Sequence, residues 1–255
     1  MLNRKIIIAN WKMNPLTLKE AEKLFNDAVK NVSLVKNTEI VVCPPSLYLE
    51  KLRKFSKKTI IGAQDAFPGD IGAFTGEVST EMLYSLGARY VILGHSERRA
   101  LGETNEDVNK KIKSALATGL RPILCVGESM RDDSHDYFNL IKTQIETCLA
   151  GVSKNSTPKI IIAYEPVWAI STTPNRRDAT AEDSQEMSIF IRKILFDKFN
   201  KEAPKIRIIY GGSVNEKTAE DFLRNGGVDG LLVGRASLDA KKFGLIVKIC
   251  ETLNK

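Results

Sequence analysis

Apolar and polar positions follow a repeating block pattern along this chain. Short apolar, β-branched runs recur, and each is followed by a segment of helix length with apolar residues spaced for one helix face. The runs are continuous rather than alternating, as expected of strands that are buried on both faces. Eight runs are predicted as strands, at residues 5–10, 39–43, 59–63, 90–93, 122–126, 159–164, 206–210 and 230–233.

The intervening segments carry helix start and stop signals. Residues 17–20 (TLKE) fit a capping box, and Ser46 follows two prolines ahead of an apolar-periodic stretch. Acidic residues follow three further predicted N-caps, and glycines stand where two helices should stop. These N-caps are Thr104, Thr180 and Asn215, and the stops are Gly119 and Gly226.

Strand–helix alternation along the whole chain predicts a parallel sheet with helices outside. Eight such units in 255 residues match an α/β fold, a closed (β/α)8 barrel of eight parallel strands with outer helices. The alternative, a doubly wound sheet, should show a G-x-G-x-x-G turn after the first strand. Residues 10–14 read NWKMN and contain no glycine. No linker divides the chain, so we predict one domain over residues 1–255.

Composition and charge exclude several classes of protein. Apolar residues make up 43% and charged residues 27%, which excludes a disordered or fibrous chain. No apolar run approaches the ~20 residues of a membrane span, and the N-terminus does not fit a signal peptide, so we expect no membrane association and a cytoplasmic location. The net charge of +7 is spread along the chain, which favours steering of a small anion over a nucleic-acid partner. The four cysteines are scattered and only two histidines exist, so no disulfide framework and no metal site are predicted.

Candidate chemistry lies at the carboxyl ends of the predicted strands, where (β/α)8 barrels carry their active sites. Glu165 ends a buried strand, and a desolvated carboxylate suits a general base, although a structural ion pair is the ordinary role of a buried Glu. His95 follows the fourth strand and could be a core histidine. If Ser96 and Glu97 open a short helix, its positive end instead favours a neutral ring that can donate to a carbonyl oxygen.

The first, seventh and eighth strands end in groups that suit an anion. Asn10 and Lys12 follow the first strand, and Lys12 is either a surface lysine or a cation beside a developing enolate. The seventh and eighth strands end in residues 211–213 (GGS) and 234–235 (GR), each ahead of a predicted helix. Backbone N–H groups of such loops bind phosphate in barrels, whereas the alternative is an ordinary glycine turn.

Base, neutral imidazole, cation and phosphate loops together indicate proton abstraction next to a carbonyl in a small phosphorylated sugar. The expected reaction is aldose–ketose isomerisation through an enediol(ate), which requires no metal and no organic cofactor. Cys125 has no second histidine to pair with and is predicted to be a buried structural thiol. Glu97 and Glu128 are predicted to be orienting or structural groups.

The sequence resembles the triosephosphate isomerase family over essentially its full length. The resemblance rests on six segments in the family's order, at residues 10–14 (NWKMN), 72–77 (GAFTGE), 94–99 (GHSERR), 125–128 (CVGE), 163–169 (AYEPVWA) and 210–214 (YGGSV). It implies interconversion of dihydroxyacetone phosphate and D-glyceraldehyde 3-phosphate, a step of glycolysis and gluconeogenesis.

The resemblance also implies roles for individual residues. Glu165 would move the proton between C1 and C2, and His95 would polarise the carbonyl and shuttle protons between oxygens. Lys12 would stabilise negative charge, with Asn10 orienting the substrate and Glu97 supporting the site. The phosphate would be held by Ser213, the backbone of Gly234 and Arg235, and the N–H of Ser171 in a lid after the sixth strand. The family is usually dimeric, and Thr75 would reach the partner's active site.

Three positions depart from the family pattern. The lid over residues 169–180 is longer and lacks the usual Gly-Thr-Gly tip, Arg235 replaces a second glycine, and Asp65 stands where asparagine is common. Two alternatives therefore stay open. One is the same chemistry on a larger, four-carbon ketose phosphate, and the other is a barrel that binds a sugar phosphate without catalysis.

Overall fold

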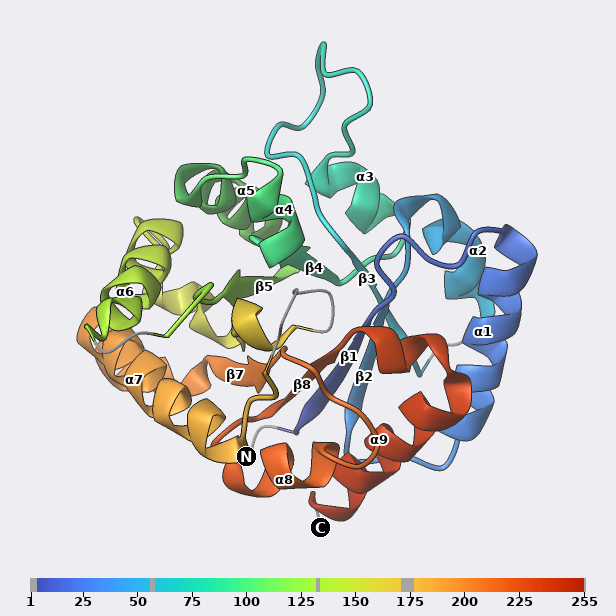
Figure 1. Ribbon diagram of the computed structural model, residues 1–255. Coiled ribbons are helices and arrows are strands. Elements are labelled where there is room, and N and C mark those ends of the chain that lie inside the picture. The colour runs from blue at the N-terminus through green and yellow to red at the C-terminus, as the bar shows by residue number, and fades with distance from the viewer. Residues whose placement is uncertain (1–3, 56–57, 132–133, 171–176, 255) are drawn as a thin grey trace.

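The strands of the protein close into a barrel, seen in a computed structural model that describes residues 4–55, 58–131, 134–170 and 177–254 (Figure 1). All pairs are parallel, each strand pairs with the next in sequence, and β8 closes the barrel against β1. The strands are β1 Ile6–Asn10, β2 Glu39–Cys43, β3 Ile60–Ala63, β4 Tyr90–Leu93, β5 Arg121–Val126, β6 Ile161–Tyr164, β7 Arg207–Tyr210 and β8 Gly230–Val233.

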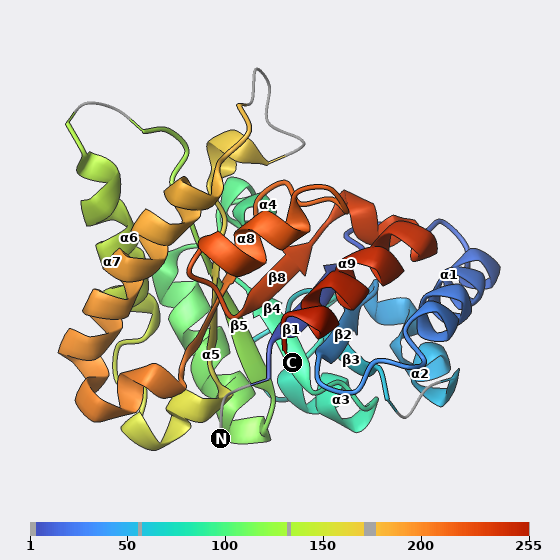
Figure 2. The same ribbon diagram turned by 90° about the horizontal axis from the view of Figure 1, so that it is seen from below.

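Helices surround the barrel, as the two perpendicular views show (Figures 1 and 2). The α-helices of the described residues are α1 Leu18–Asn31, α2 Leu49–Leu52, α3 Thr80–Ser85, α4 Ser96–Ala100, α5 Asn105–Thr118, α6 Asp136–Cys148, α7 Ala181–Phe199, α8 Ala219–Asn225 and α9 Ala240–Thr252. Short 3₁₀ turns join several of them to the strands. Those at the strand ends used below are η4 Val167–Ala169 after β6 and η6 Arg235–Leu238 after β8.

The predicted (β/α)8 architecture is confirmed, and each of the eight predicted strands is present. The observed strand ends differ from the predicted ends by two residues at most. The largest shift is in the sixth strand, which begins at Ile161 rather than at residue 159 because a 3₁₀ turn, Lys154–Lys159, precedes it. Pro158 lies inside this turn, and its missing N–H suits a turn better than a central strand.

Helix caps follow the sequence signals except at Ser46 and Asn215. Ser46 makes no capping contact, since it opens a 3₁₀ turn, Ser46–Tyr48, and the α-helix starts only at Leu49. Thr17, Thr104 and Thr180 each form the complete capping box, and Gly119 ends α5 in the left-handed conformation at φ +99°. The prediction that Asn215 caps a helix is wrong, since α8 begins at Ala219 with Thr218 as its N-cap. The side chain of Asn215 instead accepts hydrogen bonds from the backbone N–H groups of residues 217 and 218, which closes the turn before the helix.

Two apolar layers explain the continuous apolar runs. Along β1, Ile6 and Ile8 face the barrel interior, whereas Ile7 and Ala9 belong to the cluster between sheet and helices, and all four are fully buried. Both faces of each strand are therefore in the core. Burial of apolar surface stabilises the fold by ~25 cal/mol per Å².

A polar cluster closes the amino-terminal end of the barrel. Arg207 donates to the Glu39 carboxylate at 2.6 Å and to the Tyr90 hydroxyl at 3.1 Å, and Tyr90 in turn donates to Glu39. Burial alone would raise the pKa of Glu39, but the Arg207 guanidinium and the Tyr90 hydroxyl hold it below its usual value. The open end of the barrel is thus the carboxyl end of its strands.

Within the residues that the structure describes, no helix combines the length and the apolar character needed to cross a membrane.

Candidate active site

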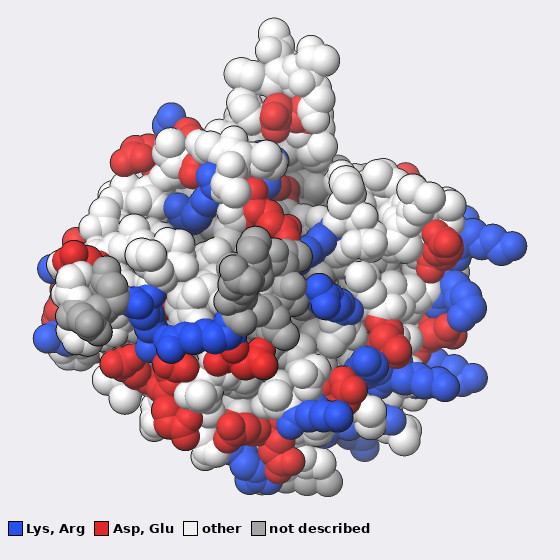
Figure 3. All heavy atoms as spheres, viewed as in Figure 1, with Lys and Arg blue, Asp and Glu red and all other residues white. Residues whose placement is uncertain are grey.

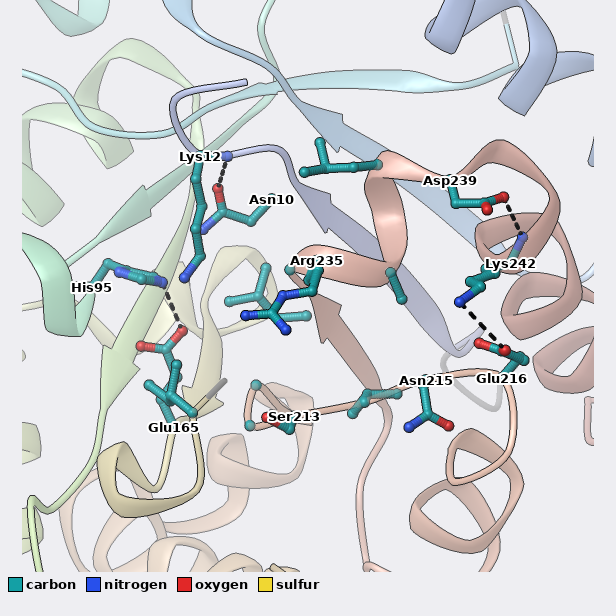
Figure 4. A pocket seen from close by; sticks show the side chains of 18 residues that line it. Asn10, Lys12, His95, Glu165, Ser213, Asn215, Glu216, Arg235, Asp239 and Lys242 are labelled. Carbon is teal, nitrogen blue, oxygen red and sulfur yellow. Dashed lines mark hydrogen bonds and ion pairs between the residues drawn. The ribbon is translucent and has the colours of Figure 1, made fainter. Parts of the chain in front are cut away.

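A cavity of about 360 Å³ lies at the carboxyl end of the barrel (Figure 4). The loops after five different strands, β1, β4, β6, β7 and β8, supply side chains to it. The sequence-predicted residues that line it are Asn10, Lys12, His95, Glu165, Ser213, Gly234 and Arg235. Residues up to 225 positions apart in sequence therefore meet at the place that the strand ends predict.

Glu165 directly follows β6, and its backbone N–H continues the strand pairing by donating to the Val126 carbonyl at 2.8 Å. The residue is only 1% exposed. One carboxylate oxygen lies 3.4 Å from Nε2 of His95, and the other accepts a hydrogen bond from the N–H of Ser96 at 3.4 Å. A carboxylate in this position is shielded from water yet can reach a molecule in the cavity.

Two glycines make room for Glu165. A Cβ on Gly127 would lie 1.8 Å from the carbonyl oxygen of Glu165, and a Cβ on Gly211 would lie 2.8 Å from its Cγ. The first clash is with backbone and cannot be relieved by a rotamer change. Sequence reasoning did not identify Gly127 as a site residue, although it adjoins Glu128 at the end of β5.

His95 is the N-cap of α4, the short helix that the sequence predicts. Its Nδ1 accepts a hydrogen bond from the N–H of Glu97 at 3.2 Å. An imidazolium carries a proton on both nitrogens and could not accept there, so this contact fits a neutral ring with its proton on Nε2. That nitrogen faces Glu165 and the cavity, and it can donate to an oxygen of a bound molecule (Figure 4).

Lys12 is held from three sides. Its N–H donates to the Asn10 side chain at 3.0 Å, its carbonyl accepts from Gln64 at 2.8 Å, and its ammonium pairs with Glu97 at 2.5 Å. Its φ of +52° is a left-handed conformation that non-glycine residues adopt at a cost. Gln64 was missed from the sequence, although its place directly after β3 is a strand-end position like the others.

The seventh and eighth strands end in two glycine-containing loops at the opposite side of the cavity (Figure 4). A Cβ on Gly212 would lie 2.2 Å from the Tyr210 hydroxyl, so the backbone there runs where a side chain has no room. The carbonyl of Gly234 accepts from both the N–H and the hydroxyl of Ser237, at 2.9 and 2.7 Å, which fixes the start of η6. Loops of this kind present N–H groups to an anion.

Three predicted residues are not in this cavity. Glu97 does not line it, but it pairs with Lys12 and lies 3.8 Å from Nδ1 of His95. Thr75 is exposed on the loop between β3 and α3 that projects away from the barrel (Figure 1). Ser171 lies outside the described residues.

Cys125 is buried beside Glu165. Burial, and after it the charge of Glu165, raises the pKa of the Cys125 thiol well above its usual value. The thiol therefore stays protonated and is a poor nucleophile, as its predicted structural role requires.

Glu128 contacts several side chains at once, whereas the sequence predicts it only as an orienting or structural group. It is fully buried, and one of its carboxylate oxygens accepts from the Tyr164 hydroxyl and the Trp168 indole, each at 2.8 Å. Arg131 also donates to it at 3.1 Å, and the Arg177 guanidinium covers the Trp168 ring at 4.3 Å. These contacts fix the chain on both sides of residues 171–176.

Together these groups can carry out one kind of chemistry. A buried carboxylate, a neutral imidazole N–H and an ammonium face one cavity, so a proton next to a carbonyl can be removed while the oxygen is stabilised. Among the described residues, no group of three or more His, Cys, Asp or Glu side chains is arranged to hold a metal ion.

Comparisons with known proteins all identify the same family. The family model described as triosephosphate isomerase matches residues 5–250. The chain is 47% identical to the triosephosphate isomerase of Aquifex aeolicus, with 96% of this chain and 98% of the relative covered. It is 45% identical to that of Dictyoglomus thermophilum and 43% identical to that of Endomicrobium trichonymphae, each over 97% of this chain and at least 99% of the relative.

Proposed function

We propose that this chain, which belongs to the triosephosphate isomerase family, interconverts dihydroxyacetone phosphate and D-glyceraldehyde 3-phosphate, the step of glycolysis and gluconeogenesis that the family name denotes. One observation carries the proposal at the level of the site. The carboxylate of Glu165 lies 3.4 Å from Nε2 of a neutral His95, inside a cavity that also holds Lys12. This set of groups suits proton transfer between two adjacent carbons of a small sugar phosphate.

In the proposed mechanism, Glu165 removes a proton from C1 of the ketose and returns it to C2. His95 donates from Nε2 to the carbonyl oxygen and shuttles a proton between the two oxygens. The ammonium of Lys12 stabilises the negative charge of the enediol(ate), and Asn10 holds the Lys12 backbone while it orients the substrate. The ion pair with Glu97 supports Lys12 in this role.

The phosphate would bind at the other side of the cavity. We propose the N–H groups at Ser213, Gly234 and Arg235 as its donors, together with Ser171 in the segment outside the described residues. Backbone N–H groups at the start of a helical turn are suited to an anion. A cavity of about 360 Å³ is large enough for a three-carbon sugar phosphate.

An assay with competing substrates tests the proposed function. We expect turnover of both triose phosphates and a much lower kcat/KM for a four-carbon ketose phosphate. The reverse preference would support the larger-substrate alternative. Binding of triose phosphates without turnover would support the non-catalytic barrel and overturn the proposal.

We also propose that the chain is cytoplasmic, folds as one domain over residues 1–255, and forms a homodimer through the loop between β3 and α3. Support for the dimer comes from this loop, which projects from the barrel and is mostly uncharged on the face seen in Figure 3. Ile71 is 88% exposed and Phe74 51% exposed on it. Large apolar side chains gathered on a projecting loop are typical of a protein interface.

Complementation between two variants tests the dimer and the place of Thr75. We expect Thr75→Ala and Glu165→Gln each to lower activity, and a mixture refolded together to exceed the mean of the two. In a mixed dimer, the Thr75→Ala chain keeps its own Glu165 and receives an intact Thr75 from its partner. A mixture equal to that mean, or a monomer in sedimentation, would contradict the proposal.

A further inference from the structure

Arg235 places a guanidinium inside the cavity, at a position that the sequence analysis assigned to the phosphate through its backbone. Its side chain projects between Asn10 and Lys12 on one side and Ser213 on the other (Figure 4). The residue as a whole is exposed, so the cavity and the surrounding water are both open to it.

The root of the Arg235 side chain is rigid. Arg235 opens η6, and the preceding carbonyl, that of Gly234, is locked by two hydrogen bonds from Ser237. Arg235 is not among the described non-glycine residues with a positive φ, so other side chains fit its backbone without strain. The backbone therefore fixes the place from which the Arg235 side chain extends. Substitutions at this position should change the chemistry of the cavity rather than the fold.

Several other charged side chains that line the cavity make ion pairs or hydrogen bonds. The ammonium of Lys12 pairs with Glu97 at 2.5 Å, and Lys242 lies 3.9 Å from Glu216. Asp239 accepts from the N–H groups at the start of α9. Arg235 adds a further positive charge to the lining of the cavity, at the end where the glycine loops lie.

We propose that the guanidinium of Arg235 binds the phosphate of the substrate directly, in addition to the backbone N–H groups around it. The proposal rests on the phosphate end of the proposed function. A guanidinium presents paired donors that match two phosphate oxygens, and it carries a full charge where backbone amides carry only partial ones. The three-carbon substrate then has one end at Glu165 and His95 and a dianion at Arg235.

The contact is present in the ground state and in the transition state alike, because the phosphate does not react. It therefore strengthens binding without accelerating the proton transfer itself, so its loss should raise KM and leave kcat nearly unchanged. A hydrogen bond to a charged group contributes about 1.5–3 kcal/mol. Because Arg235 is exposed to water, the lower end applies, which corresponds to about a tenfold change in affinity.

Titration with inorganic phosphate and steady-state kinetics test the inference in the full-length protein. Arg235→Gln removes the charge, and Arg235→Lys keeps the charge but loses the paired donors. Lys241→Gln is the matched control, because Lys241 is an exposed cation close in sequence that does not line this cavity. Thermal unfolding of each variant confirms that the fold is retained.

We expect the Kd for phosphate and the KM for triose phosphate to rise about tenfold in Arg235→Gln, with Arg235→Lys intermediate and Lys241→Gln within about twofold of the unchanged protein. Equal losses in Arg235→Gln and Lys241→Gln would show general charge attraction and overturn the inference. Unchanged or lower values in Arg235→Gln would also overturn it, since the side chain would then only fill space. Phosphate titration gives this answer even if the chain shows no isomerase activity, so the inference and the proposed function can fail separately.

Discussion

Replacing Glu165 by glutamine is expected to lower kcat by about 10²–10⁴-fold, the usual contribution of a general base. Glutamine has nearly the same shape, so it can keep the contact with the N–H of Ser96 and the space that Gly211 leaves for the side chain. It cannot accept a proton from carbon at any useful rate. KM should change little, because the phosphate end of the cavity is untouched.

Proton exchange with solvent gives a second, independent readout of the same variant. In deuterated water, the unchanged protein should incorporate deuterium at the carbon that is reprotonated, and the Glu165→Gln variant should lose incorporation in proportion to turnover. Glu165→Asp keeps a carboxylate but withdraws it by one methylene, so its activity should lie between the two. Glu146→Gln, an exposed glutamate on α6, is the control for the loss of one negative charge. Full activity in Glu165→Gln would overturn the assignment of the base.

The barrel could be predicted from the sequence because its strands lie between two apolar layers. Ile6, Ile7 and Ile8 are all buried although they point to opposite faces, so a continuous apolar run was the correct signal. Caps such as Thr104 were predictable because a capping box involves residues only three positions apart. The prediction at Asn215 was wrong because short-range contacts alone do not show that a helix starts there. Asn215 makes the short-range contacts of a cap, but they close a turn, and the helix starts four residues later.

Part of the site could be located in the same way, since strand ends in a barrel converge whatever their separation in sequence. Contacts between loops could not be located from the sequence in this way. The Lys12–Glu97 pair joins residues 85 positions apart, and the hydrogen bond from Gln64 to Lys12 spans 52. Gly127 matters only because the Glu165 carbonyl passes 1.8 Å from the place of its missing Cβ. No local pattern encodes such an approach, because it depends on how two neighbouring strands end in space.

Lys12 offers the second large effect. Removing its ammonium by Lys12→Gln is expected to lower kcat/KM by about 10²–10³-fold, as for other groups that stabilise charge in the transition state. The loss should appear in kcat and KM together, since in the proposed mechanism the ammonium faces both the developing enediolate and an anionic substrate. Lys12→Arg keeps a positive charge and should recover part of the activity. Steady-state kinetics on the three proteins measure this, and an unchanged kcat/KM in Lys12→Gln would exclude Lys12 from the mechanism.

The backbone of Lys12 makes a further distinction possible. At φ +52°, a side chain is held in a conformation that costs about 1 kcal/mol or more, whereas glycine adopts it freely. Lys12→Gly should therefore be as inactive as Lys12→Gln but more stable than it, while the Asn10 and Gln64 contacts to the backbone of residue 12 persist in both. Urea unfolding of the two variants measures the difference. The two variants lose the same charge and differ in backbone strain. If the more stable variant, Lys12→Gly, were also the more active one, Lys12 would act through the fold. Equal inactivity at unequal stability would mean that the ammonium itself is required, and that the strained backbone is retained because it points this cation at the substrate.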